Sequence, residues 1–175
     1  RDLAISPDGR RLVYVAANGT QLVVHSLDRL APTILTGIGR PSNPVFSPDG
    51  QWIAFYDGVT ALKKVPATGG SPVTLSPIKG PPFGLSWGSD DTIFFTDGDR
   101  GELLRVGAAG GQPTALTSPD RALGEAFHNW PEVLPGGEAV LFNISSGPGP
   151  PAVGVLDLTT GTRKVLVRGG SQAHY

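Results

Sequence analysis

One segment of the chain has the pattern of a catalytic serine. Gly84-Leu85-Ser86-Trp87-Gly88 matches G-x-S-x-G, the nucleophile motif of acyl-transferring hydrolases. That motif works on a sharp strand-to-helix turn and needs a partnered histidine. Here the strand-like residues Thr92–Thr96 follow, and no helical pattern does. The sequence therefore favours a structural role for Ser86, and no catalytic residue is predicted.

A second segment has closely spaced carboxylates. Asp97, Asp99 and Glu102, with Gly98 and Gly101 between them, resemble the start of a calcium-binding loop. The bidentate glutamate expected later in such a loop is missing at its usual spacing. The favoured interpretation is a solvated turn like the one at Asp57-Gly58, so no cofactor is predicted and calcium stays an alternative.

A third group combines an aromatic residue with several hydrogen-bonding side chains. His128, Asn129 and Trp130 follow a polar insertion at Ser118–Ala126 that contains Arg121 and Glu125. An aromatic ring beside polar groups in a loop is typical of a ligand-binding lip, and these five residues are the predicted binding site. The alternative is structural, with Trp130 packing and His128 tethering the loop. His25 and His174 are too far from His128 in sequence to predict a metal site.

Composition excludes several classes of partner and linkage. The net charge is −1, which gives no electrostatic reason to expect nucleic acid or an anionic membrane. No run of eighteen apolar residues indicates a membrane span. Cysteine is absent, so disulfides and cysteine-ligated zinc are excluded. Because the 175 residues start at Arg1 and contain no methionine, we expect a piece of a longer protein.

The elements that must position these residues follow from an internal repeat. Ser6-Pro7-Asp8-Gly9 returns 41 residues later as Ser47-Pro48-Asp49-Gly50. Degenerate copies follow at Gly88–Asp91 and Leu134–Gly137. Each copy lies between two apolar strand-like runs, and two further runs follow it. A period near 40–45 residues with four strands per unit is typical of a β-propeller.

The predicted fold is therefore all-β, a propeller of four four-stranded antiparallel blades within a larger propeller. The blades are expected at residues 1–40, 41–80, 81–118 and 127–168. Asp-Gly predicts tight primed hairpins between the first and second strands. The second strands, such as Arg11–Ala16 and Trp52–Tyr56, are almost wholly apolar, which predicts burial on both faces. Four blades can close into a ring, or an open arc can pair with another copy.

The repeats resemble the TolB-type, WD-repeat-like propellers of bacterial proteins. They are most similar to the C-terminal propeller regions of bacterial serine/threonine protein kinases. Three segments carry this resemblance: Leu62–Gly70, Ser86–Ile93 and Asp120–Gly137. It implies an extracytoplasmic or periplasmic sensing or interaction platform of a signalling protein. No kinase motif is present, and the resemblance assigns no catalytic residue.

The leading functional hypothesis is a non-catalytic binding or sensor module. Its ligand would be a protein, a peptide or a small molecule at the loop-lined face of the axis. An alternative is a hydrolase- or lactonase-like propeller enzyme with polar residues at the channel mouth, for which Asp2, Asn43 and His128 are the candidates. The other alternative is a structural propeller fragment that assembles with itself as a homo-oligomer.

Overall fold

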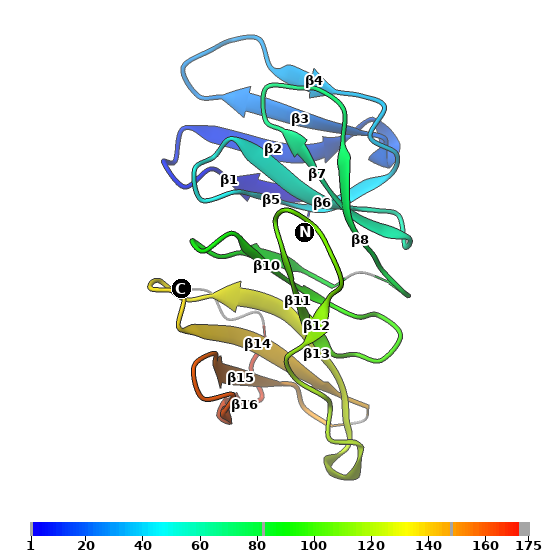
Figure 1. The fold of residues 1–175 in the computed structure, drawn as a ribbon, viewed down its shortest axis with the longest axis vertical. Coiled ribbons are helices and arrows are strands. Elements are labelled where there is room, and N and C mark those ends of the chain that lie inside the picture. Colours follow the sequence, from blue (N-terminus) through cyan, green and yellow to red (C-terminus); the bar gives the residue numbers. More distant parts are fainter. Residues whose placement is uncertain (1, 82, 148, 172–175) are drawn as a thin grey trace.

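The computed structural model describes residues 2–81, 83–147 and 149–171, which form four four-stranded antiparallel sheets (Figure 1). In each sheet the strands lie side by side in chain order. We call the sheets blades 1 to 4. This confirms the all-β propeller fold. The strands of blades 1 and 2 are β1 (Leu3–Ile5), β2 (Arg11–Ala16), β3 (Gln21–Ser26), β4 (Thr33–Leu35), β5 (Pro41–Phe46), β6 (Trp52–Asp57), β7 (Ala61–Pro66) and β8 (Val73–Pro77).

Blades 3 and 4 have the same order. Their strands are β9 (Leu85–Trp87), β10 (Thr92–Thr96), β11 (Leu103–Gly107), β12 (Thr114–Ala115), β13 (Glu125–Val133), β14 (Ala139–Ser146), β15 (Ala152–Asp157) and β16 (Arg163–Arg168). Two short 3₁₀ turns, η1 (Ala17–Gly19) and η2 (Arg121–Leu123), are the helical elements of the described residues. Neither of these turns is long and apolar enough to cross a membrane.

The repeated turn between the first and second strands has one geometry in blades 1 to 3, whereas in blade 4 the third turn residue, Gly136, also has a positive φ. In blade 1 the Gly9 N–H donates to the Ser6 carbonyl, and the Asp8 carboxylate accepts from the Ser6 hydroxyl and the Arg10 N–H. Only the glycine has a positive φ, at 70°. Both primed turns need a positive φ at the first central residue, and neither central residue here, Pro7 or Asp8, has one, so the predicted primed hairpin is wrong. Proline second and glycine fourth instead fit a type I turn.

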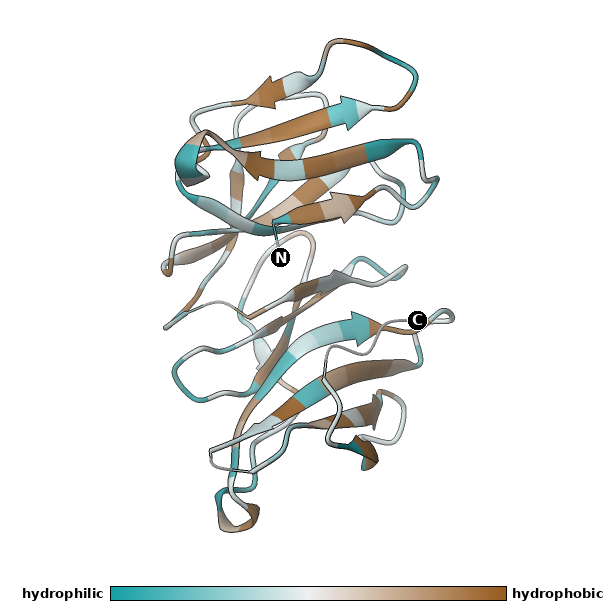
Figure 2. Ribbon diagram, turned by 180° about the vertical axis from the view of Figure 1, so that it is seen from behind, coloured by the Kyte–Doolittle hydropathy of each residue, from teal (hydrophilic) through white to brown (hydrophobic). Residues whose placement is uncertain are grey.

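Adjacent blades pack face to face through three apolar seams. Blades 1 and 2 share a core around Val13 and Phe55, blades 2 and 3 one around Tyr56 and Phe95, and blades 3 and 4 one around Phe142. Figure 2 shows the hydrophobic colour following the strands that form these seams. We call the face of a blade that packs on the next blade its forward face, and the opposite one its rear face.

The prediction that second strands are buried on both faces holds for the inner blades. Four consecutive residues of β6, Ile53 to Tyr56, are fully buried. In β2 only Val13 is fully buried, because blade 1 has no neighbour on its rear face. The described residues form no seam between blade 4 and blade 1, and the four blades make an open arrangement with β4 and β16 at opposite ends (Figure 1).

Candidate functional site

The innermost strands of blades 2 to 4 share a backbone irregularity. In β5 and β13 the pairing register shifts between Ser42 and Val45 and between Asn129 and Glu132. Within these bulges Asn43 has φ 50° and Trp130 has φ 53°. Gly84, at the same place in the repeat of blade 3, has φ 83°. Bulges on such strands re-aim a side chain, so these three left-handed positions form a repeated feature next to the axis.

Two of these positions, Gly84 and Trp130, lie in contact across the seam between blades 3 and 4. The Tyr56 hydroxyl of blade 2 donates to the Gly84 carbonyl of blade 3 over 2.9 Å. The Trp130 N–H of blade 4 donates to the Phe83 carbonyl over 3.0 Å. A Cβ atom on Gly84 would lie 2.8 Å from the Trp130 Cα and 2.9 Å from its ring Cε3. Glycine at position 84 is therefore what allows Trp130 to lie against blade 3.

Trp130 combines strain with accessibility. A left-handed conformation costs a residue with a side chain about 1–2 kcal/mol, and bulky residues rarely adopt it. The ring is only half-buried. Strained residues of this kind concentrate at ligand-binding positions, where the surrounding structure holds them in place. Trp130 is therefore the strongest binding candidate among the five predicted site residues.

Two of the other predicted residues, Glu125 and His128, form a charged cluster with Arg163 at the seam of blades 3 and 4. The Glu125 Oε2 atom accepts hydrogen bonds from the Asp120 N–H and the Arg163 guanidinium, both over 2.7 Å. The same Arg163 nitrogen lies 2.9 Å from the His128 Nε2. Glu125 and His128 are buried, and Arg163 is partly exposed. The cluster links the start of the innermost strand β13 to the start of the outermost strand β16.

The two ring nitrogens of His128 have three partners. Nδ1 lies 2.7 Å from the Thr117 hydroxyl, and Nε2 lies 2.9 Å from the donating Arg163 guanidinium and 3.1 Å from the accepting Glu125 Oε2. Burial lowers the pKa of His128 below its usual value and so favours the neutral ring, although the hydrogen bond to Glu125 opposes the shift. Burial also raises the pKa of Glu125, but the bonds from the Asp120 N–H and Arg163 outweigh it and the pKa is lowered. The cluster is thus a carboxylate, a guanidinium and a neutral imidazole.

Arg121 extends this link to blade 3. Its guanidinium donates to the carbonyls of Arg100, Glu125 and Ala126. Asp120 caps the η2 turn by accepting from the Ala122 and Leu123 N–H groups. The polar insertion therefore joins blades 3 and 4 through hydrogen bonds. This agrees with the structural alternative, in which His128 tethers the loop.

Asn129 has one unused hydrogen-bonding atom. Its Nδ2 donates to the Ser145 hydroxyl, while its buried Oδ1 has no hydrogen-bond partner among the described residues. Buried acceptors are almost always paired, with protein, water or a ligand. Asn129 precedes Trp130 in the same bulge, so an orphaned buried acceptor lies next to the half-buried Trp130.

The remaining candidates take part in turns and strand pairing. The Asp97 carboxylate accepts from the Asp99 and Arg100 N–H groups in the turn before β11. No cluster of three metal-ligating residues occurs in the described part of the chain. Ser86 lies on β9, where its hydroxyl accepts from the Val133 N–H, and a strand rather than a helix follows. This is not the setting of a hydrolase nucleophile.

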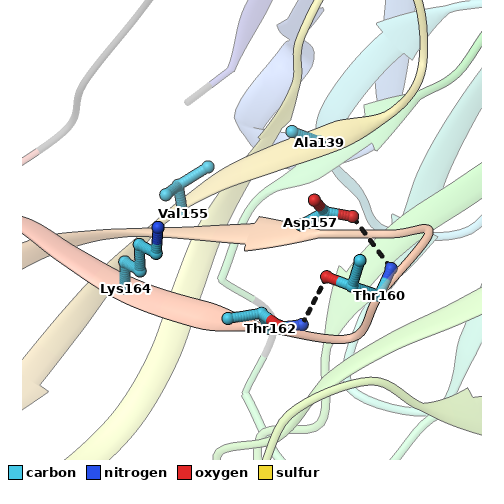
Figure 3. A pocket seen from close by; sticks show the side chains of 6 residues that line it. All are labelled: Ala139, Val155, Asp157, Thr160, Thr162 and Lys164. Carbon is cyan, nitrogen blue, oxygen red and sulfur yellow. Dashed lines mark hydrogen bonds between the residues drawn. The ribbon is translucent and has the colours of Figure 1, made fainter.

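A shallow hollow lies elsewhere, on the forward face of blade 4. It is lined by Ala139, Val155, Asp157, Thr160, Thr162 and Lys164 (Figure 3). The Asp157 carboxylate accepts from the Thr159 hydroxyl and from the Thr160 and Thr159 N–H groups, and these bonds, the hydroxyl's first, lower its pKa to about 2. Val155 and Lys164 are paired neighbours on β15 and β16.

His128, Asn129 and Trp130 were expected in a loop, whereas all three lie within β13, which starts at Glu125. The contact of Arg163 with Glu125, 38 residues away in the sequence, was not predicted. The bulge shared by β5 and β13 could have been recognised in the sequence. Asn43 and Trp130 each precede a proline, and each lies six residues before the third residue of the turn that follows in its own blade.

Comparisons with known proteins identify the fold. No protein-family model and no curated protein sequence matches the chain. The structure is similar to a putative TolB from Agrobacterium tumefaciens, with TM-score 0.76 and 24% identity over 94% of this chain and 60% of that one. TolB from Acinetobacter baumannii gives TM-score 0.75 and 19% identity over 96% of this chain and 43% of that one.

A further similar structure is an oligogalacturonate lyase in complex with manganese, with TM-score 0.69 and 15% identity over 95% of this chain and 52% of that one. The chain thus spans about half of the length of the solved propellers it matches. Both enzymes and non-enzymes occur among them. At these identities the likeness concerns architecture, and the four blades of this chain have the fold of a TolB-type β-propeller.

Proposed function

We propose that this chain is a non-catalytic interaction module that binds a peptide segment of a partner protein beside the propeller axis. The observation that carries the proposal is the left-handed, half-buried Trp130, which packs on Gly84. An aromatic ring held rigidly costs little entropy on binding and supplies a large contact area.

The charged residues support binding over catalysis. Glu125, His128 and Arg163 satisfy one another and join blades 3 and 4, and Arg121 is bound to three carbonyls. A catalytic acid or base must instead reach a substrate proton. From its resemblance to the propeller regions of bacterial kinases, we propose that the module is part of a sensing platform outside the cytoplasm.

The test uses a phage-displayed library of random peptides as the probe. Peptides selected on the native chain are titrated against Trp130→Gly, which removes the ring but accepts φ 53° and reproduces the residue of blade 3. We expect the Kd to rise at least about tenfold, a loss of about 1.4 kcal/mol. Asn18→Gly, which relieves a φ of 57° in the η1 turn, is the matched control and leaves the Kd unchanged.

Two results would contradict the proposal. One is a selection that yields no peptide distinguishing the native chain from Trp130→Gly. The other is hydrolysis of a p-nitrophenyl ester that disappears in Ser86→Ala, since this would make the chain an enzyme.

A further inference from the structure

Three side chains tie the outermost strand of blade 4 to its innermost strand. Glu125 and His128 belong to β13, and Arg163 is the first residue of β16. The Glu125 Oε2 atom accepts from the Arg163 Nη1 over 2.7 Å and lies 3.1 Å from the His128 Nε2. These two nitrogens are themselves 2.9 Å apart. One carboxylate oxygen is therefore shared by two groups that also contact each other, and we call the three residues the latch.

The contacts of the latch are compatible with one another only while His128 is neutral. A neutral ring can leave Nε2 without a proton, as an acceptor for the Arg163 guanidinium. A protonated ring carries an N–H group on both nitrogens, and a guanidinium has no acceptor atom. Two donors and two positive charges would then face each other across 2.9 Å. Protonation therefore makes His128 and Arg163 compete for the oxygen of Glu125.

The structure indicates which of the two competitors leaves. The His128 side chain is fully buried, its Nδ1 lies 2.7 Å from the Thr117 hydroxyl, and its ring packs on Phe142 with the ring centres 4.9 Å apart. The Arg163 side chain is 28% exposed and has a long flexible stem. Within the described part of the chain its guanidinium bonds only to the latch. Arg163 can turn into water, whereas the imidazolium cannot.

The charges around the ring make proton uptake and the departure of Arg163 reinforce each other. Burial lowers the pKa of His128 most, the hydrogen bond to Glu125 opposes this, and the positive charges of Arg163 and Arg121 lower the pKa further. Strand β14 and the segment after β12 present the neutral Phe142 ring and Thr117 hydroxyl to His128. Removing Arg163 removes one of the two cations, so the ring binds its proton more tightly once the latch is open.

We propose that the latch is a pH switch, in which a proton taken up from solvent by His128 transfers the Glu125 carboxylate to the imidazolium and releases Arg163 into water. Strand β16 keeps its pairing with β15 but loses its tie to β13. Acid thus loosens the outermost strand of blade 4, while His128 continues to join β13 to the segment after β12 at the seam with blade 3. The switch is independent of the proposed peptide-binding role.

The first experiment follows the native chain by NMR between neutral pH and about pH 5. The imidazole signals of His128, identified with His128→Gln, report its protonation. The Nη signals of Arg163 are separate while the guanidinium is held and merge when it turns freely. We expect them to merge with the same midpoint as the protonation of His128. Arg168, an exposed arginine of the same strand, is the internal control and shows merged signals throughout.

The second experiment measures hydrogen exchange of the β16 amides at the same pH values, corrected for the intrinsic pH dependence of exchange. The β6 amides of the buried core report global unfolding. Relative to them, we expect β16 protection in the native chain to fall at least about tenfold as His128 becomes protonated. In Arg163→Gln this protection should be low already at neutral pH, and in His128→Gln the fall should be absent. His25→Gln, which removes a histidine of blade 1, should keep the native profile.

Three results would overturn the proposal. The first is a His128 that stays neutral until the whole chain unfolds. The second is a set of Arg163 signals that does not change while His128 takes up its proton, a result obtained on the native chain whether or not the variants fold. The third is a fall in β16 protection that persists in Arg163→Gln or His128→Gln, since the strand would then loosen without the latch.

Discussion

Gly84 and Trp130 lie so close together that neither position can be changed without regard to the other. A Cβ atom on Gly84 would approach the Trp130 Cα to 2.8 Å and the Pro131 Cδ to 3.3 Å, in backbone that cannot easily move. Both residues are left-handed, and they belong to different blades. The packing of blade 4 on blade 3 therefore depends on a missing side chain.

Gly84→Ala is expected to destabilise the protein strongly. Its φ of 83° costs an alanine about 1–2 kcal/mol, and the clash with Trp130 adds about 1–3 kcal/mol. Urea denaturation measures the loss. Gly9→Ala, with φ 70° and no atom near the new Cβ, should show only the backbone part. Equal losses in the two variants would mean that the contact with Trp130 carries no energy.

Tyr56→Phe is expected to cost about 1–3 kcal/mol of unfolding free energy, because the Gly84 carbonyl loses its hydroxyl donor in a buried place. Burial also raises the pKa of Tyr56 above its usual value, so the hydroxyl stays protonated and donates throughout the accessible pH range. Thermal and urea unfolding check the loss. Tyr14→Phe in blade 1, on the free rear face, is the comparison and should be nearly neutral.

Arg163→Gln is expected to destabilise the chain by about 1–3 kcal/mol, since it leaves the buried Glu125 carboxylate without its guanidinium. Arg168→Gln changes an exposed arginine of the same strand and should cost less than about 0.5 kcal/mol. A double variant with Glu125→Gln should recover part of the loss of Arg163→Gln. Additive losses in that double-mutant cycle would show that the two side chains do not interact.

Stability should fall as the pH drops below the usual value of histidine, 6.5. The folded-state pKa of His128 is lowered, so the unfolded chain takes up a proton first and the folded state loses free energy until its own pKa is reached. One such group contributes at most about 1.4 kcal/mol per pH unit. Glu125 adds a loss at lower pH, since its folded pKa lies below the usual 4.5.

The measurement is the urea midpoint between neutral and mildly acidic pH. His128→Gln should flatten the slope below pH 6.5, because glutamine does not titrate. A slope that is unchanged in His128→Gln would assign the pH dependence to other groups.

The repeat made most of the fold predictable, because turn residues with a fixed local geometry recur between apolar runs. Ser6–Gly9 and Ser47–Gly50 were enough to set the blade period. The contact between Arg163 and Glu125 was not predictable, because it depends on how a twisted sheet brings its first and last strands together.

The candidate site was found only in part for a similar reason. Trp130 and Asn129 were recognised by residue type, but they were placed in a loop before the strand. In a bulge the strand stays paired on both sides while one residue turns away. The positive φ of Trp130 could not be predicted, because tryptophan is not a residue type that favours this backbone conformation.

The left-handed bulge also has a consequence for how this architecture diversifies. One backbone geometry carries an amide at Asn43, no side chain at Gly84 and an indole at Trp130. Single substitutions at this position in successive blades can therefore change which side chains lie beside the axis, while the fold of the blades stays the same. Blades 2 to 4 thus each have one position at which a change of side chain can alter the binding specificity beside the axis.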